Sequence, residues 1–402
     1  MTGNHQHNRG TGLRGAAYSV RSCSEPTRDD IGAGRWIALD ESGQHGDQLQ
    51  RENRYVALGV VAIDDVTAAR IIEDLRDRAR RDHVAIQAPE LSFSKSFAGK
   101  GTGKAQRRAI LADLLGAGGA LAERASVYLI DTDYFIVVKL VDLLIEEAVH
   151  ASGTPSPGPE FYRTLARDLA LEGPRALGDE GFTRLLGAAG TFFAKRNTRA
   201  DIVSVDELFK VIKDSRNRAR RRRAPQARKA TEVLDLLLRT RAAAEEFASD
   251  RRAETGTPEA DSVRDSMEPL IPCVAAAIGS AAEAYRAVRA LGDEHRLLTD
   301  STLELMHKGV NALQAFEGLR ERNSLEQLVR GRSCEHPSLQ LADLVAGSGY
   351  AVGLRCSGEE TEAGLQLAPA IIPLIDPQSL MPYVDVRRNL WDAVGLDPSE
   401  PA

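Results

Sequence analysis

Three short apolar runs in the first third of the chain limit most strongly how it can fold. They occupy residues 35–42, 54–63 and 125–131, and each has the length of a β-strand. The polar loop between the first two predicts a β-hairpin. Residues 64–83 and 102–118 instead carry apolar side chains at helical spacing. Strands and helices mixed in this way predict an α/β protein with a mixed sheet flanked by helices.

The remaining elements are expected further along the chain. Asp133 is expected to cap the helix that follows the third run, and Thr102 to cap the helix that it begins. The chain reads as almost wholly helical from residue 161 to about Leu291. The other expected elements are strands at 89–94, 295–301 and 324–334, and helices at 133–150 and 336–352.

The pattern also suggests how the chain is divided. A Pro- and Gly-rich stretch at 151–160 separates the first strands and helices from the long helical region. The expected parts are a disordered arm at 1–33, an α/β core at 34–151 and 266–356, a large helical insertion at 152–265, and a C-terminal extension at 357–402.

Bulk properties exclude some classes of protein. The 402 residues carry a net charge of −6, which neither favours nor excludes nucleic acid as a partner. Four widely spaced cysteines form no C-x-x-C pair, so a disulfide scaffold or zinc ribbon is not expected. No apolar run is long enough to span a membrane and the start lacks a signal core, so the chain is expected in the cytoplasm.

Acidic residues stand at the ends of several expected strands. Asp40, Asp131 and Asp300 each close one, and such strand ends are where open α/β sheets build their sites. In the late helix, Gln340 and Asp343 are three residues apart and therefore share a face. Acids that converge repel one another unless a cation lies between them, and oxygen ligands suit Mg²⁺ or Mn²⁺. Paired metals of this kind support phosphodiester cleavage.

The adjacent acids Asp40 and Glu41 cannot both reach one metal from a regular strand, because successive side chains point to opposite faces. Asp40 is the expected ligand, while Glu41 would cap the following turn, hold an Arg, or swing in where the strand breaks. A simpler alternative is that Asp40 and Ser42 only form a local Asx-type turn.

These motifs together resemble a known family. "ALDESG" near the start and "HPSLQLADLVAG" near the end are similar to the Asp-Glu and Gln-x-x-Asp motifs of the family named domain of unknown function 3800. "PELSFSKS" resembles the family segment with a Glu and a Lys, here Glu90 and Lys95, and "LLTDS" its Asp-bearing strand, here Asp300. The likeness covers about 35–150 and 266–355.

The resemblance implies a ribonuclease H-like fold, in which a first strand, a middle strand and a last helix present Asp residues. It implies a nuclease-like site without a demonstrated substrate, and some members are associated with phage defence. The implied metal ligands are Asp40, Asp300 and Asp343, with Glu41 and Gln340 as further catalytic candidates. Asp131, Glu90 and Lys95 would stand around the site.

A run of basic residues in the helical insertion is a candidate nucleic-acid contact. Such a cluster can neutralise phosphates without reading sequence, although a solvated helix face explains it equally well. The residues concerned are Arg216, Arg218, Arg220, Arg221, Arg222 and Arg223.

The expected function is therefore a Mg²⁺- or Mn²⁺-dependent nuclease or phosphodiesterase-like hydrolase that acts on DNA or RNA. The helical insertion would dock nucleic acid, a protein partner or a second copy of the chain. The alternative is a non-catalytic nucleic-acid- or protein-binding module with a vestigial acidic site.

Overall fold

The computed structural model describes residues 35–43, 54–193, 203–222, 225–253, 269–294, 303–304, 306–308, 324–359 and 361–397. The arm expected at 1–33 and the strand expected at 295–301 lie outside these residues. Among the described helices, none has the length and apolar character needed to cross a bilayer.

The described strands form one mixed sheet. They are β1 (Arg35–Ser42), β2 (Tyr55–Val61), β3 (Ala125–Asp131), β4 (Ala287–Asp293) and β5 (Ser324–Gly331). Their order is β3-β2-β1-β4-β5, with β2 antiparallel to both neighbours and the β1-β4 and β4-β5 pairs parallel. The sequence therefore predicted the α/β class and the β1-β2 hairpin correctly.

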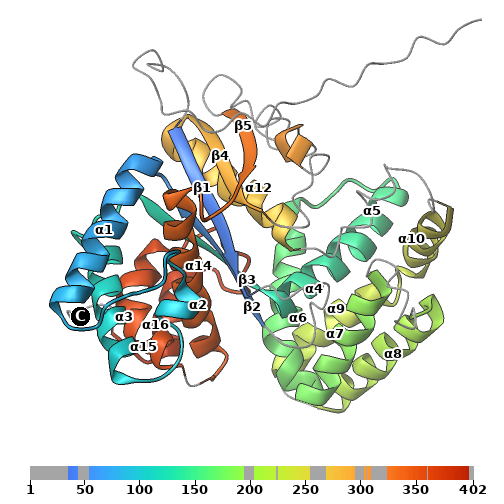
Figure 1. Ribbon diagram of the computed structural model, residues 1–402. Coiled ribbons are helices and arrows are strands. Elements are labelled where there is room, and N and C mark those ends of the chain that lie inside the picture. Colours follow the sequence, from blue (N-terminus) through green and yellow to red (C-terminus); the bar gives the residue numbers. More distant parts are fainter. Residues whose placement is uncertain are drawn as a thin grey trace, which may run out of the picture. The chain divides into compact units, whose positions relative to one another are not determined.

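Helices account for most of the remaining described chain (Figure 1). They are α1 (Asp65–Arg81), α2 (Phe93–Ser96), α3 (Thr102–Leu115), α4 (Thr132–Leu140), the π-helix η2 (Val141–Glu146), α5 (Glu147–Ala151), α6 (Pro159–Leu177), α7 (Asp179–Phe193), α8 (Val205–Arg221), α9 (Pro225–Leu237), α10 (Arg241–Ala253), α12 (Leu270–Tyr285), α14 (Pro337–Cys356), α15 (Glu362–Ile371), the 3₁₀ turn η4 (Ile372–Leu374) and α16 (Val386–Val394).

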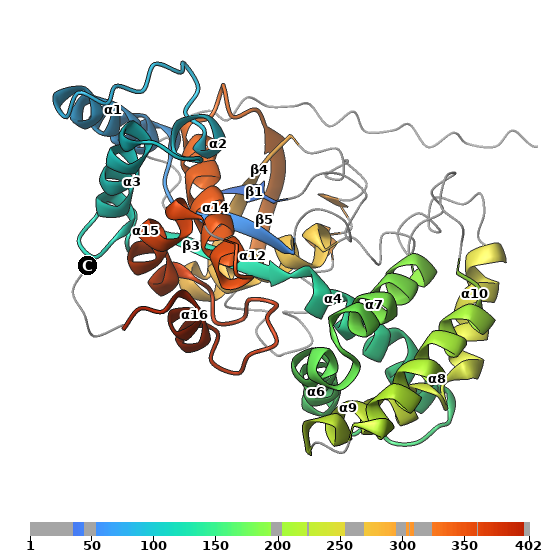
Figure 2. The same ribbon diagram turned by 90° about the horizontal axis from the view of Figure 1, so that it is seen from below.

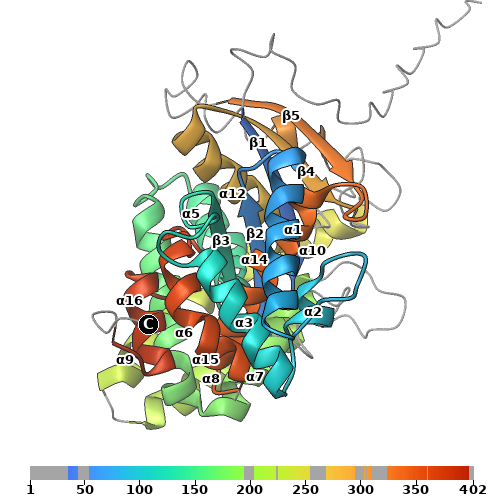
Figure 3. The same cartoon turned by 60° about the vertical axis from the view of Figure 1, so that its left-hand side comes forward.

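The two faces of the sheet bury different sets of helices. One face packs on α14, with α1, α3, α15 and α16 around it (Figures 2 and 3). The other face shares a core with α12 and with the helices between β3 and β4. Along β1 the sides alternate, since Ala38 belongs to the α14 core and Leu39 to the other. Asp40 therefore points toward α14.

Small residues let α14 lie very close to β2. A Cβ on Gly59 would stand 2.4 Å from the carbonyl oxygen of Ala342 and 2.6 Å from the backbone nitrogen of Ala346. On another side of α14, a Cβ on Gly347 would stand 2.3 Å from a ring carbon of Phe93, the first residue of α2. Because Gly59 is the register partner of Asp40, this close approach sets how near α14 comes to the acid on β1.

Two expected elements are wrong. The helical reading up to Leu291 fails because α12 ends at Tyr285, and the next residues form β4. The strand expected at 89–94 does not form. Its alternate backbone N–H groups, at Leu91 and Phe93, donate to side chains of α14 instead of to a neighbouring strand.

Two expected helix caps also differ by a residue or two. Asp131, not Asp133, caps α4 by accepting from the Asp133 and Tyr134 backbone nitrogens. Gly101, not Thr102, is the N-cap of α3. In both helices the residue that the sequence suggested as the cap lies inside the first turn, one or two residues after the observed cap. Helix ends are the least sharply defined part of a helix.

Candidate metal centre of clustered carboxylates

Asp40 lies near the end of β1, where the sheet meets α14. Its side chain is buried, and its Oδ1 accepts a hydrogen bond from the Glu41 backbone nitrogen at 2.8 Å. Asp40 is therefore a charged group on an apolar face, held by one local bond. Burying a carboxylate in this way is costly unless a positive partner compensates it.

Asp293 closes β4 beside Asp40. The parallel register pairs Leu39 with Gly292, so Asp40 and Asp293 occupy the next level of neighbouring strands. Adjacent strands lie about 4.8 Å apart and residues at one level share a face. Leu291, two residues earlier, belongs to the α14 core, so Asp293 faces α14 as well. Its Oδ1 accepts from the Ser333 backbone nitrogen at 3.2 Å.

Asp343 approaches the same place from α14. Its Oδ2 accepts from the Phe93 backbone nitrogen at 2.6 Å, at the start of α2. Glu90, three residues before Phe93, accepts a hydrogen bond from the Ser333 hydroxyl. Four acids from four segments of the chain thus border one region. We call Asp40, Glu90, Asp293 and Asp343 the acidic cluster.

The pKa shifts indicate that these carboxylates are close enough to repel one another. Burial raises the pKa of Asp40 well above its usual range, and the negative charges of Glu41, Asp343 and then Asp293 raise it further. Burial also raises the pKa of Asp293, with a contribution from Glu90.

Asp343 follows the same pattern. Burial raises its pKa most, and Asp293 and Glu90 add to the increase. Hydrogen bonds from Phe93 and Ser92 act in the opposite direction. The carboxylates of the cluster therefore disfavour one another's ionisation, and a divalent cation would relieve this repulsion.

The donor set fits a hard cation, but the side chains are not gathered around a single point. Within the described ranges, no three His, Cys, Asp or Glu side chains stand close enough together to hold a metal ion. All four acids of the cluster supply oxygen, the ligand that Mg²⁺ and Mn²⁺ prefer. Ligation would therefore require their side chains to turn toward one another.

Gln340 has a different place from the one expected for a catalytic group. Its Oε1 accepts from the Leu91 backbone nitrogen and its Nε2 donates to the Ser333 carbonyl oxygen, each at 2.9 Å. Both ends of the buried amide are thus engaged by backbone. Gln340 joins α14 to the segment before α2 and to the loop after β5, and so fixes the neighbours of Glu90 and Asp293.

A latch at the start of α14 adds to this support. The Asp65 carboxylate accepts hydrogen bonds from the Ser338 backbone nitrogen at 3.0 Å and from its hydroxyl at 2.6 Å. The Nδ1 atom of His336 lies 2.8 Å from the second carboxylate oxygen of Asp65. The first turn of α14 is therefore tied to the first turn of α1.

Other residues expected at the site lie apart from it or beside it. Glu41 points to the opposite face of β1 from Asp40, as strand alternation requires. Lys95 is an exposed residue of α2, at the border of the cluster. Asp300 lies outside the described residues. Asp293 closes β4, a strand that the sequence did not predict.

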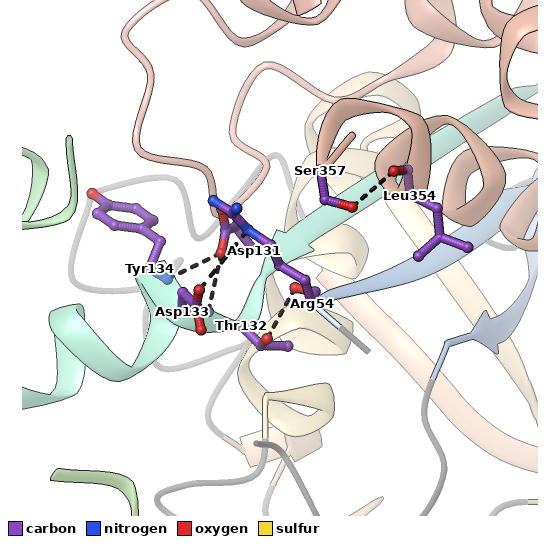
Figure 4. Close-up of polar contacts among 7 residues, drawn as sticks. All are labelled: Arg54, Asp131, Thr132, Asp133, Tyr134, Leu354 and Ser357. Atoms are coloured by element: carbon purple, nitrogen blue, oxygen red, sulfur yellow. Dashed lines mark hydrogen bonds and ion pairs between the residues drawn. The ribbon is translucent and has the colours of Figure 1, made fainter. Parts of the chain in front are cut away.

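Asp131 belongs to a separate network (Figure 4). It accepts from Arg54 at 3.0 Å and caps α4. The β3 residue level with Asp40 is Val127, and Asp131 lies four residues further along the strand, roughly 13 Å. Asp131 therefore anchors the β3-α4 junction rather than the acidic cluster.

The Arg residues expected to bind nucleic acid mostly hold the helices together. Arg216 and Arg220 both pair with Asp235, at 3.2 and 2.8 Å. Arg218 and Arg222 donate to carbonyl oxygens of Leu177 and Arg175. Arg221 is exposed, and Arg223 lies outside the described residues.

No protein-family model, curated protein or solved structure matches the chain.

Sequence reasoning missed Asp293 and Ser333. A signal for Asp293 was present: "AVRALGD" alternates, with Val288 and Ala290 buried, and ends on an acid. Its small apolar residues continue the pattern of the preceding helix, which hid the boundary. Ser333 had no local signal, since its importance comes from contacts with distant segments.

Proposed function

We propose that the chain is a divalent-metal-dependent hydrolase that cleaves phosphodiester bonds of nucleic acid on a ribonuclease H-like sheet. The observation that carries the proposal is the acidic cluster. Three of its acids come from the first strand β1, the interior strand β4 and the late helix α14, which is similar to the first strand, middle strand and last helix that the family resemblance implied. Asp293 is the acid of the cluster that the sequence did not suggest, and the proposed role of Asp300 stays a prediction.

The chemistry follows from the donor set. Asp40, Asp293 and Asp343 would hold Mg²⁺ or Mn²⁺, with Glu90 as a fourth oxygen ligand. Bound metal would supply an activated water and stabilise the leaving oxygen. The chain's own contribution is positional: Gln340 and Ser333 fix the segments that carry Glu90 and Asp293, while the Asp65 latch fixes the start of α14.

The test combines cleavage with metal binding. Incubation of labelled DNA and RNA with Mn²⁺ should give products that Asp40→Asn and Asp343→Asn abolish. Asp113→Asn is the matched control, because Asp113 is an exposed acid of α3 that pairs with Arg78. Mn²⁺ should also raise the melting temperature of the wild type and of the control, and not that of Asp40→Asn.

A non-catalytic binding module is the second candidate. It is favoured by the absence of a ready-made three-ligand group among the described residues. Nucleic-acid binding without cleavage, together with a melting temperature unchanged by Mg²⁺ or Mn²⁺, would decide for the module.

A further inference from the structure

A basic segment lies directly beside the acidic cluster. Residues 91–112 contain Lys95, Lys100, Lys104, Arg107 and Arg108 and no Asp or Glu. The chain as a whole has more acids than bases, 58 against 52. Positive charge is therefore concentrated locally, in α2, the turn after it and the first half of α3.

Hydrogen bonds hold the cations of α3 against the end of α2. The Lys104 ammonium donates to the Lys95 carbonyl oxygen, and Arg107 donates to the Ser96 carbonyl oxygen at 3.1 Å. Lys104 and Arg107 are three residues apart and so share one side of α3. Both side chains are therefore fixed in place, with further N–H groups left to donate.

Arg108 serves the fold and is not part of this surface. It is fully buried, donates to the Phe97 and Gly99 carbonyl oxygens, and contacts Glu362 at 3.3 Å. The remaining cations, Lys95, Lys100, Lys104 and Arg107, form what we call the α2–α3 basic surface.

This surface keeps most of its charge uncompensated. Lys95 and Lys100 are exposed, and among the described residues neither has an ion pair with a carboxylate. Burial, followed by repulsion from Arg107 and Arg108, lowers the pKa of Lys104. A group of like charges without a counter-charge attracts an anion.

The basic surface adjoins the acidic cluster through α2. The first residue of α2, Phe93, donates its N–H to Asp343, and Lys95 follows two residues later. α2 lies beside α14 and α3 (Figures 2 and 3). A strand of phosphates would be repelled by the acidic cluster alone, so an adjacent cationic surface is what its approach requires.

We propose that the α2–α3 basic surface binds the phosphate backbone of a nucleic-acid strand and guides it to the acidic cluster. This inference rests on the proposed function, since the acidic cluster is where the bound strand would be cleaved. Phe93 and Phe97, the aromatic residues of this segment, are buried, so stacking on bases contributes nothing here. The surface therefore binds backbone without selecting sequence.

The experiment measures binding separately from cleavage. Anisotropy of labelled single-stranded DNA, single-stranded RNA and duplex DNA is recorded with the full chain in EDTA, over a series of salt concentrations. The test variant is Lys95→Gln/Lys100→Gln. The control is Arg220→Gln/Lys229→Gln, which removes the same charge from cations paired with Asp235 and Asp168.

The test variant should bind at least about ten-fold more weakly, and its slope of log affinity against log salt should fall by about 1 to 2. The control should bind like the wild type, and the test variant should melt at the wild-type temperature. The DNA and RNA arms identify which strand the surface takes.

The outcomes of the two proposals are separable. Unchanged affinity and slope in Lys95→Gln/Lys100→Gln would overturn the basic surface even if the protein cleaves nucleic acid. Loss of binding in that variant, without cleavage by the wild type, would support the surface and overturn the hydrolase. No binding by the wild type would overturn the surface outright.

Discussion

Replacing Gln340 by leucine should destabilise the fold, which distinguishes a structural clamp from a catalytic amide. Gln340 is 8% exposed and makes two hydrogen bonds of 2.9 Å, one with the Leu91 N–H and one with the Ser333 carbonyl. Leucine has a similar volume but leaves both backbone groups without a partner. An unsatisfied buried group costs about 1–3 kcal/mol. Because Ser333 is only half-buried and can recruit water, the expected loss in unfolding free energy is about 2–3 kcal/mol.

Urea denaturation of the metal-free protein measures this difference, and hydrogen exchange at the Leu91 amide localises it. Gln106→Leu is the control, because Gln106 is an exposed residue of α3, and it should change stability by less than about 0.5 kcal/mol. If Gln340→Leu were as stable as the control and lost only activity, the clamp would be refuted and a catalytic role restored.

Three further predictions concern the cluster and its support. Burial raises the folded-state pKa of Asp40, so the folded protein binds the proton more tightly than the unfolded chain does. The metal-free wild type should therefore gain stability as the pH falls toward the ordinary pKa of an aspartate, about 4, and Asp40→Asn should lose much of that gain in thermal melts. Arg108→Met should lower the free energy of unfolding by about 2–4 kcal/mol, because buried carbonyl groups, including that of Phe97, lose their donor. Urea denaturation measures this loss, and an unchanged urea midpoint would contradict the prediction. Gly59→Ala should lower the free energy of unfolding by about 1–3 kcal/mol, because the new methyl group meets the Ala342 backbone. It should also reduce any stabilisation by Mn²⁺ in thermal melts. A wild-type response to Mn²⁺ would show that α14 need not stay in place.

Local patterns predicted what depends on local rules. The apolar runs at β1, β2 and β3 and the capped helix α1 follow from side-chain periodicity, and all four were predicted. β4 was not predicted, because "AVRALGD" follows the Ala-rich α12 and its Val and Ala side chains suit either structure. The turn between them is marked only by Arg286 at a φ of 68°, which no residue preference announces.

Members of the acidic cluster were suggested by the sequence only where a strand end, a helical spacing or a motif pointed to them. Asp40 was suggested in this way, Asp343 by its helical spacing from Gln340, and Glu90 through the family resemblance. Asp293 was missed together with its strand. The Arg residues of α8 were expected to face nucleic acid, but Arg216 and Arg220 pair with Asp235 of α9. Sequence shows that cations are present and cannot show which acid, far along the chain, already neutralises them.

The position of the cluster follows from packing rather than from the acids themselves. Gly59 stands level with Asp40 in the antiparallel register, and the Ala342 carbonyl lies against it, one residue before Asp343. A larger residue at 59 would hold α14 away from the sheet, whatever acid the helix carried. The apolar core can support this approach because α14 is buried along nearly its whole length. The chain therefore uses a very close backbone contact to bring together side chains that repel one another. A bound cation would remove this opposition of packing and charge.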